Sequence, residues 1–297
     1  MKWEYLREEE FKGALERSGK VCAMVLGCLE KHGQHLPVGT DSLKGDKIAE
    51  LAAEKADVML FPTTMWLGDV SCNHAFENPE NGKGGGYGYV AMSTETLLTV
   101  LEELCDEIAR NGFKKIVLLG SHGGNTPLLQ YFQRSQLYKK KDYITYIGRA
   151  YDFREQLQPA NMLKVAKENP EYLPMLTEED LKTLERFAET GTGGGHGDFR
   201  ETMLVQGTYP ELVREDKFEA ESGLNIGRYT PVPGVESTLI GWFANCPNAF
   251  GGYAPIGCSR TIGEAAVKMS VDRLAKIFEY LKNDESYVGV LDDIANQ

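Results

Sequence analysis

Acidic and imidazole side chains follow directly after an apolar run near the amino terminus. The run from Val21 to Leu26 predicts a buried strand, and it is followed by Glu30, His32 and, after a Gly/Pro turn, Asp41. Glu30 and His32 are two residues apart, so an extended backbone directs both side chains to the same side. Imidazole and carboxylate groups together are typical ligands of divalent transition metals. The spacing therefore predicts a metal site at the end of this strand.

Each of these residues also has a simpler interpretation. Asp41 precedes a predicted helix from Ser42 to Lys55 and could be its N-cap, while Glu30 and His32 could be solvated loop residues. The histidine inventory favours the metal site, because every histidine lies in a glycine-containing or polar connector rather than in a periodic segment. The histidines are His32, His35, His74, His122 and His196.

Two later segments bring further candidate ligands. The apolar run Ile116–Gly120 predicts a buried strand that ends just before His122 and a helix. Open parallel α/β sheets bind their ligands at this position, outside the carboxyl ends of the strands. The glycine-rich segment from Gly191 to Gly197 then carries His196 and is followed by Glu201. Its glycines either allow close approach to a ligand or form a flexible hinge.

The candidate ligands outnumber those of a single zinc site, which usually takes three protein ligands and a water. They fit two divalent metal ions (Zn, Mn or Fe) about 3.5–4 Å apart that share Asp41 as a bridge. A metal pair can hold a hydroxide at neutral pH and polarise a carbonyl, while His196 moves a proton to the leaving nitrogen. The predicted ligands are Glu30, His32, Asp41, His122 and Glu201.

Other polar residues near the predicted strand ends are candidates for substrate binding. The connector from Leu67 to Tyr89 is long and contains Asn73 and His74, which fits a substrate-facing loop or a flexible surface excursion. Three further candidates follow predicted strands, where their side chains can hydrogen-bond a polar substrate. These are Asn125, Arg149 and Asp152.

Strands that alternate with helices predict the fold. Apolar runs at residues 21–26, 58–62, 116–120 and 143–147 are separated by segments of helical periodicity, such as the amphipathic segment capped by Ser93 or Thr94. This order favours a single α/β domain over residues 1–297, a three-layer α/β/α sandwich with a mostly parallel sheet. The charged stretch at about 155–190 has helical spacing and is typical of an inserted helical hairpin or lid.

Composition excludes several classes of partner. The 297 residues carry a net charge of -12, which disfavours nucleic acid and anionic membranes because both require a positive surface. We find no signal peptide and no apolar run of about 18 residues, so we expect a cytoplasmic protein with a small-molecule substrate. The six cysteines form no C-x-x-C pair, which argues against disulfides and a thiolate zinc site.

These residues together resemble the creatininase (creatinine amidohydrolase) family. The resemblance covers roughly residues 15–210 and rests on Glu30-x-His32-Gly33-x-His35-Leu36-Pro37 with Asp41, on His122-Gly123-Gly124-Asn125, and on His196 with Glu201-Thr202. It implies an α/β/α fold, a binuclear metal site, hydrolysis of amide bonds in small and often cyclic substrates, and a homo-oligomer, commonly a hexamer. By position it implies that Glu30, His32, Asp41 and His122 bind metal and that His196 is catalytic.

The sequence departs from the pattern of the creatinine-cleaving members at three places. Gly124 stands where they carry a metal-binding Glu, so we predict Glu201 as the replacement, and their His-Ala-Gly-Glu segment reads His196-Gly197-Asp198-Phe199. No tryptophan lies between residues 67 and 241 to match those that clamp creatinine. The sequence therefore leaves more than one substrate class in consideration. Some family members hydrolyse a ring C–C bond in an oxidised cyclitol of the keto-inositol type, and a non-catalytic binding protein of the same fold is the third hypothesis.

Overall fold

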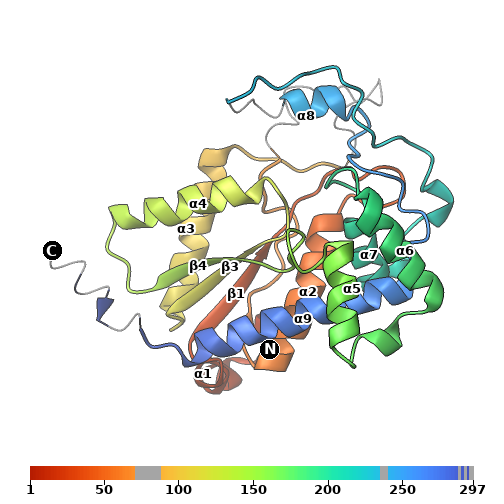
Figure 1. Ribbon diagram of the computed structural model, residues 1–297. Helices are drawn as coiled ribbons and strands as arrows, with labels where there is room; N and C mark the ends of the chain where they lie inside the picture. The colour runs from red at the N-terminus through yellow and green to blue at the C-terminus, as the bar shows by residue number, and fades with distance from the viewer. Residues whose placement is uncertain (71–87, 235–239, 287–288, 291–292, 294–297) are drawn as a thin grey trace.

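A four-stranded parallel sheet forms the centre of the molecule (Figure 1). The computed structural model describes the chain apart from residues 71–87, 235–239, 287–288, 291–292 and 294–297. Strands β1 and β3 pair over their full lengths in the middle, and β2 and β4 flank them in the order β2-β1-β3-β4. The strands are β1 (Val21–Leu26), β2 (Met59–Leu60), β3 (Lys115–Gly120) and β4 (Ile144–Arg149).

Helices cover both faces of this sheet, because successive strand residues point to opposite sides. Val21, Ala23 and Val25 of β1 belong to one core cluster, and the intervening Cys22 and Met24 belong to the other. The first cluster includes residues of α2, α5, α6, α7 and α9, and the second includes residues of α1, α3 and α4. The structure thus confirms the predicted α/β/α sandwich with a parallel sheet.

The helices have the following bounds. The α-helices are α1 (Glu8–Arg17), α2 (Thr40–Ala56), α3 (Thr94–Arg110), α4 (Asn125–Ser135), α5 (Pro159–Glu168), α6 (Glu178–Thr190), α7 (Phe199–Thr208), α8 (Ile240–Asn245) and α9 (Arg260–Asn283). The short 3-10 helices are η1 (Trp3–Tyr5), η4 (Gln136–Tyr138), η5 (Leu173–Met175), η6 (Pro210–Leu212) and η7 (Glu215–Lys217). None of the described helices is both long enough and apolar enough to cross a bilayer.

Two boundaries differ from the sequence prediction. Helix α2 begins at Thr40, with Gly39 as its N-cap, so Asp41 lies inside the first turn. The capping interpretation of Asp41 is therefore wrong, and its side chain is available for other contacts. Strand β2 contains two residues instead of the five predicted at 58–62. One reason is Pro62, which has no backbone N–H for a ladder hydrogen bond.

The charged stretch at about 155–190 is helical, but its apolar side chains belong to the main core. Helices α5 and α6 pack against each other, and Leu163, Leu184 and Phe187 are buried in the same cluster as β1 and α9. The prediction of helices agrees with the structure, whereas the lid interpretation does not, because a lid would leave these side chains outside the core. That this segment is an insertion in a single domain remains a prediction.

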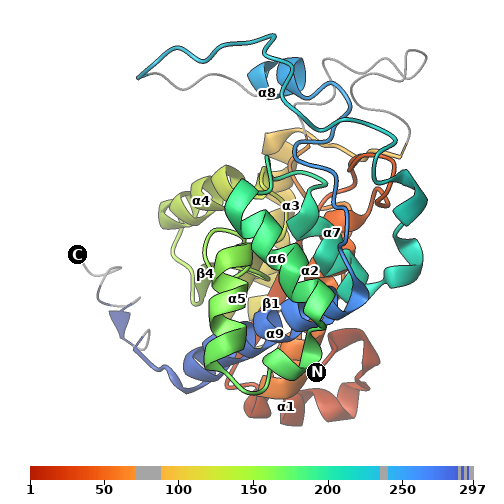
Figure 2. The ribbon, with the colours of Figure 1, turned by 45° about the vertical axis from the view of Figure 1, so that its right-hand side comes forward.

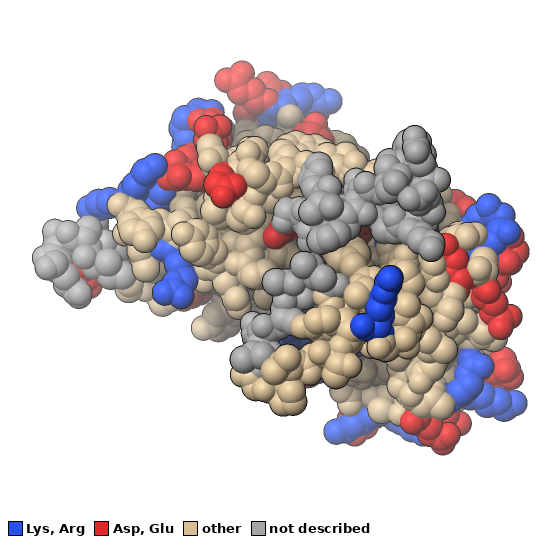
Figure 3. Space-filling model, turned by 90° about the horizontal axis from the view of Figure 1, so that it is seen from above, with Lys and Arg blue, Asp and Glu red and all other residues tan. Residues whose placement is uncertain are grey.

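The loops that follow the strands lie toward one end of the molecule. Helix α8 lies at this end and α1 at the opposite one, as Figures 1 and 2 both show. On the face seen from the α8 side, charged side chains gather mainly toward the rim (Figure 3). The carboxyl ends of β1 and β3 are adjacent, since Leu26 pairs with Gly120. The loops carrying Glu30, His32 and His122 therefore start side by side.

Close packing of α2 against the end of β3 sets the position of Asp41. The hydroxyl of Ser121 donates to the backbone carbonyl of Asp41 at 2.7 Å. Gly45, one turn further along α2, faces the same serine, and a Cβ built on it would lie 2.5 Å from the Ser121 Cβ. Only a glycine permits this approach, so the helix, the serine and the aspartate are held together.

We predict that Gly45→Ala destabilises the protein by about 1–3 kcal/mol, because the added methyl overpacks the contact with Ser121. The control is Gly13→Ala on the exposed face of α1, where the nearest atom is the end of a flexible arginine at 3.4 Å. It should stabilise by about 0.5–1 kcal/mol, since alanine is the better helix residue. Urea unfolding of both variants measures the difference, and equal stability of the two would contradict this account.

Candidate metal centre and active site

Six side chains from five loops and helix ends converge above the carboxyl ends of β1 and β3. Two come from the loop after β1, one from the first turn of α2, one from the residue pair after β3, one from the loop before α7, and one from the first turn of α7. They form overlapping groups of metal-ligating atoms that lie within 4.8 Å of one another. The six are Glu30, His32, Asp41, His122, His196 and Glu201.

The first group surrounds the imidazole of His122. Its Nδ1 lies 3.0 Å from Glu30 Oε1 and 3.1 Å from Asp41 Oδ2. The thiol of Cys28 lies 3.1 Å from the same Asp41 oxygen and belongs to the group. Burial, with the negative charge of Asp41 nearby, raises the pKa of this thiol well above its usual value. Cys28 is therefore a protonated neighbour of the ligands in this structure, which disfavours a nucleophilic role.

The second group surrounds the imidazole of His32. Its Nε2 lies 3.4 Å from Asp41 Oδ2 and 3.4 Å from Glu201 Oε2. Asp41 belongs to both groups through the same oxygen, in keeping with a shared ligand. Gly124 has no side chain to offer, while Glu201 reaches this group from α7. The donors in each group are carboxylates and imidazoles, the types that divalent transition metals bind.

Two buried atoms at the centre make no well-aligned hydrogen bond among the described residues, although each lies close to a charged neighbour. They are Glu30 Oε1 and His32 Nε2, which lie 4.0 Å apart. Leaving a buried polar atom unpaired costs free energy, so native proteins rarely do it. Both atoms are metal-ligand types that face the shared oxygen of Asp41, and a divalent cation would satisfy both of them. The donor set therefore fits the metal that the sequence predicted.

A fully buried lysine joins the two carboxylates of the second group. Lys44 Nζ lies 2.5 Å from Asp41 Oδ1 and 2.6 Å from Glu201 Oε1. Although burial alone would lower it, the two negative charges raise the pKa of Lys44 well above its usual value. The ammonium thus orients both carboxylates and leaves their other oxygens facing His32. Sequence reasoning missed Lys44, although it lies three residues after Asp41 and four before the buried Ile48 on the apolar face of α2.

The loop before α7 positions His196 and Glu201. Gly197 has a positive φ of 68°, a conformation that favours glycine, and its N–H donates to Glu201 Oε2 at 2.6 Å. Asp198 is the N-cap of α7 and accepts from the N–H of Arg200 and of Glu201. His35, in the first sequence motif, pairs through Nε2 with the carbonyl oxygen of Gly197 at 2.8 Å. The two sequence motifs are therefore joined directly.

His196 lies against the second group of ligands. Its ring stacks on that of His32 at a centroid distance of 4.1 Å, and its Nε2 lies 2.7 Å from the carbonyl oxygen of Lys31. A carbonyl only accepts, so Nε2 carries the proton of the neutral ring and Nδ1 is left with a lone pair. Burial, together with the positive charge of His32, lowers the pKa of His196 below its usual value. His196 is thus a neutral imidazole at pH 7.

The cavity over the centre has an aromatic wall that sequence reasoning missed. It has a volume of about 480 Å³, and Trp242 and Phe243 of α8 line it together with His196 and the ligands. Trp242 meets the ring of His196 edge to face at 5.1 Å. The two aromatic residues follow directly after residues 67–241, the range that contains no tryptophan. The only available signal was the Trp-Phe pair in a segment rich in proline and glycine.

The predicted substrate-binding residues have different positions. Arg149 lines a second cavity beside His122 and also borders a neighbouring depression with Asp152, which caps the turn at Arg154. Asn125 is fully buried, and its amide pairs with the backbone of Leu26, Gly27 and Asp69. The prediction that Asn125 binds substrate is therefore corrected to a structural role. Two further candidates lie outside the described residues. These are Asn73 and His74.

We predict that Lys44→Met destabilises the metal-free protein by about 3–5 kcal/mol, because it leaves two buried carboxylates without a counter-charge. Adding a divalent metal should then raise the melting temperature of the variant more than that of the parent protein. Lys47→Met is the matched control, since this lysine lies on the same helix but is partly exposed and pairs with Glu50. Thermal unfolding with and without Mn²⁺ tests this, and an unchanged metal-free melting temperature would contradict it.

Metal affinity should also depend on pH. Despite its burial, the negative charges of Asp41 and Glu201 raise the pKa of His32 to about 9. A metal ligand must be deprotonated, so at pH values below 9 the metal has to displace this proton. We expect the affinity to increase by about tenfold per pH unit between pH 6 and 8 for this one proton. Calorimetry in two buffers counts the released protons, and a count of zero would refute the assignment.

Comparisons with known proteins identify the family. The family model "Creatininase: Creatinine amidohydrolase" matches residues 4–278. A creatinine amidohydrolase of Pseudomonas putida is 22% identical over 242 residues, which make up 77% of this chain and 84% of that protein.

Solved structures with similar folds carry related names. The structure "Creatininase Mn" is 19% identical with a TM-score of 0.64, covering 95% of this chain and 99% of that one. A putative creatinine amidohydrolase from Bacteroides fragilis is 19% identical with a TM-score of 0.62, covering 90% and 91%. Because the family model spans nearly the whole sequence, the chain belongs to the creatininase family.

Proposed function

We propose that the protein is a metal-dependent hydrolase of a small polar carbonyl compound, most simply an amide or cyclic amide. The observation that carries the proposal is the gathering of three carboxylates and three imidazoles, in which two buried atoms, Glu30 Oε1 and His32 Nε2, lack a well-aligned hydrogen bond. Membership of the creatininase family supports the reaction class, since the matching family model and the curated relative are both described as creatinine amidohydrolases.

We propose two metal ions, each held by one group of ligands. Glu30, Asp41 and His122 would hold one, and His32, Asp41 and Glu201 would hold the other. A bound pair of divalent ions supplies Lewis-acid polarisation of the carbonyl and a lower pKa for water. Lys44 holds the outer oxygens of Asp41 and Glu201, so these carboxylates stay oriented without the metal. The relatives include creatininases described as Mn and Zn-Zn forms, which supports this type of cofactor.

His196 is the proposed proton carrier. Its Nε2–H is held by the carbonyl of Lys31, which leaves the Nδ1 lone pair 3.7 Å from Glu30 Oε1, beside the ligands. A neutral imidazole in this position takes a proton from the attacking water and gives it to the leaving nitrogen. Stacking on His32 and the edge contact with Trp242 keep the ring in this orientation. Trp242 and Phe243 would also pack against the substrate and exclude water.

A second candidate reaction uses the same groups on a different bond. Hydrolysis of a ring C–C bond in an oxidised cyclitol also begins with attack of water on a carbonyl. The cavity beside His122 favours a polar substrate of this kind, because Ser121, Thr126, Arg149 and Tyr151 line it. A non-catalytic binding protein is the least supported hypothesis, since both groups of ligands are present. We further propose a homo-oligomer in the cytoplasm, as the family resemblance and the sequence suggest.

A substrate panel tests the reaction class. The metal-loaded protein should hydrolyse at least one compound among creatinine, hydantoins, lactams, linear amides and keto-inositols. Release of amine or ammonia would identify amide hydrolysis, whereas a new carboxylate without amine would identify C–C cleavage. Inactivity toward all amides and lactams would refute the leading proposal.

Two substitutions separate metal binding from proton transfer. Asp41→Ala should lose metal while the fold persists, because it removes the ligand common to both groups. His196→Ala should keep its metal and lose about 10²–10⁴-fold in kcat, the usual contribution of a general acid–base. Metal analysis and kinetics on the same preparations provide the measurement. A fully active His196→Ala protein would show that the proton takes another route.

A further inference from the structure

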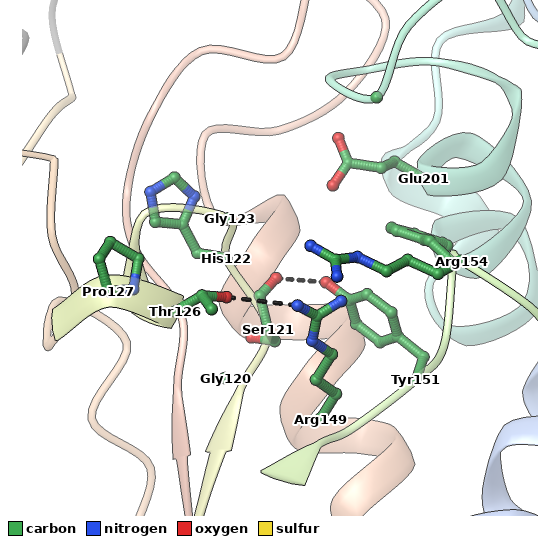
Figure 4. Close-up of a pocket in the computed structure, with 12 residues that line it drawn as sticks. Gly120, Ser121, His122, Gly123, Thr126, Pro127, Arg149, Tyr151, Arg154 and Glu201 are labelled. Carbon is green, nitrogen blue, oxygen red and sulfur yellow. Dashed lines mark hydrogen bonds between the residues drawn. The ribbon is translucent and has the colours of Figure 1, made fainter. Parts of the chain in front are cut away.

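A second cavity lies directly beside the metal centre. It has a volume of about 410 Å³ and opens between the ends of β3 and β4 and the start of α4 (Figure 4). It shares part of its wall with the cavity over the centre, so a ligand bound at the metals can extend into it. The shared residues are His122, Gly123, Pro127, Gly195 and Glu201.

Two arginines line this second cavity without an acidic partner. Arg149 follows β4 and makes a single long hydrogen bond, from Nη2 to Thr126 Oγ1 at 3.5 Å. The guanidinium of Arg154 has no hydrogen bond or ion pair within the described part of the chain. In contrast, nearby Arg200 is paired with Asp198 at 2.8 Å. Two cations without an acidic partner therefore line the same cavity.

The acidic groups around the cavity are engaged elsewhere. Glu201 forms part of the opposite wall, but its two oxygens pair with Lys44 and with the N–H of Gly197. Asp152 accepts from the backbone N–H groups of Arg154 and Glu155 and lines a neighbouring depression, which both arginines also border. No described carboxylate oxygen therefore lies within ion-pair distance of either guanidinium.

Figure 4 shows both guanidinium groups pointing into the same space, toward Ser121 and Glu201. Two like charges in one cavity repel each other unless an anion lies between them. The planar fork of arginine matches the oxygens of a carboxylate or phosphate, and the bond is charge-assisted. The amino-terminal turn of α4, with Thr126 and Pro127 on the cavity wall, adds the positive end of a helix dipole.

We propose that the substrate carries a negatively charged group, a carboxylate or a phosphate, which binds Arg149 and Arg154 while its carbonyl lies at the metal centre. This inference rests on the proposed function, because it specifies the substrate of the same site. The substrate is then an acid whose reacting part lies between the aromatic wall of α8 and the ligands. Creatinine has no such acidic group.

Anion binding to the metal-loaded, full-length protein tests the proposal directly. The probes are inorganic phosphate and glutarate, titrated by calorimetry at constant ionic strength with chloride as the background salt. Arg149→Gln and Arg154→Gln should each weaken binding by about tenfold or more, the usual value of a hydrogen bond to a charged group. Arg134→Gln, on the exposed end of α4, is the control and should bind like the parent protein. Tighter binding of one probe distinguishes a phosphate from a carboxylate group.

Cobalt-substituted protein provides the second measurement. Anions held by the arginines should leave the visible spectrum of the bound Co²⁺ unchanged, whereas direct ligation to the metal would alter it. An anion affinity in the arginine variants equal to that of the parent protein, no measurable binding to the parent protein, or a changed spectrum would each overturn the proposal. Arg154 is exposed, so its variant should retain the parent's melting temperature. Hydrolysis of an amide that carries a carboxylate at the same rate by the parent protein and by both arginine variants would refute the acidic substrate while leaving the hydrolase function intact.

Discussion

The buried ion pairs of Lys44 hold the two halves of the site together. Asp41 and Glu201 are separated by 160 positions in the sequence, and one ammonium lies within 2.6 Å of an oxygen of each. Helices α2 and α7 therefore meet at the metal centre through charge as well as through apolar packing. Three carboxylates in a buried space would repel one another without cations, so the lysine makes the arrangement possible before any metal binds.

Much of the fold and of the centre was predictable from the sequence. The strands were visible because parallel strands buried on both faces form continuous apolar runs, as in Val21–Leu26 and Ile116–Gly120. The gathering of candidate metal-binding side chains was predictable because the carboxyl ends of adjacent parallel strands bring Glu30, His32 and His122 to the same edge of the sheet.

The other features of the site depend on contacts between distant residues, which the spacing of residues along the sequence does not reveal. Lysines on helices usually lie in solvent. The burial of Lys44 depends on the second carboxylate, which α7 supplies from a distant part of the sequence. Asn125 follows a strand in the same way as His122. Only the structure shows that its side-chain amide is fully hydrogen-bonded to backbone groups. Trp242 belongs to a short helix in an aperiodic segment, where neither its orientation nor its distance from His196 follows from the sequence.

The backbone of His196 pairs with that of Gly251, since the N–H of Gly251 donates to the carbonyl of His196 at 2.8 Å and the N–H of Gly195 donates back to Gly251. Gly251 lies only six residues after helix α8, which carries the aromatic wall. Any displacement that swings the wall outward would therefore pull on the imidazole as well. The segment that carries the aromatic wall and the residue proposed to move the proton are therefore coupled through backbone hydrogen bonds.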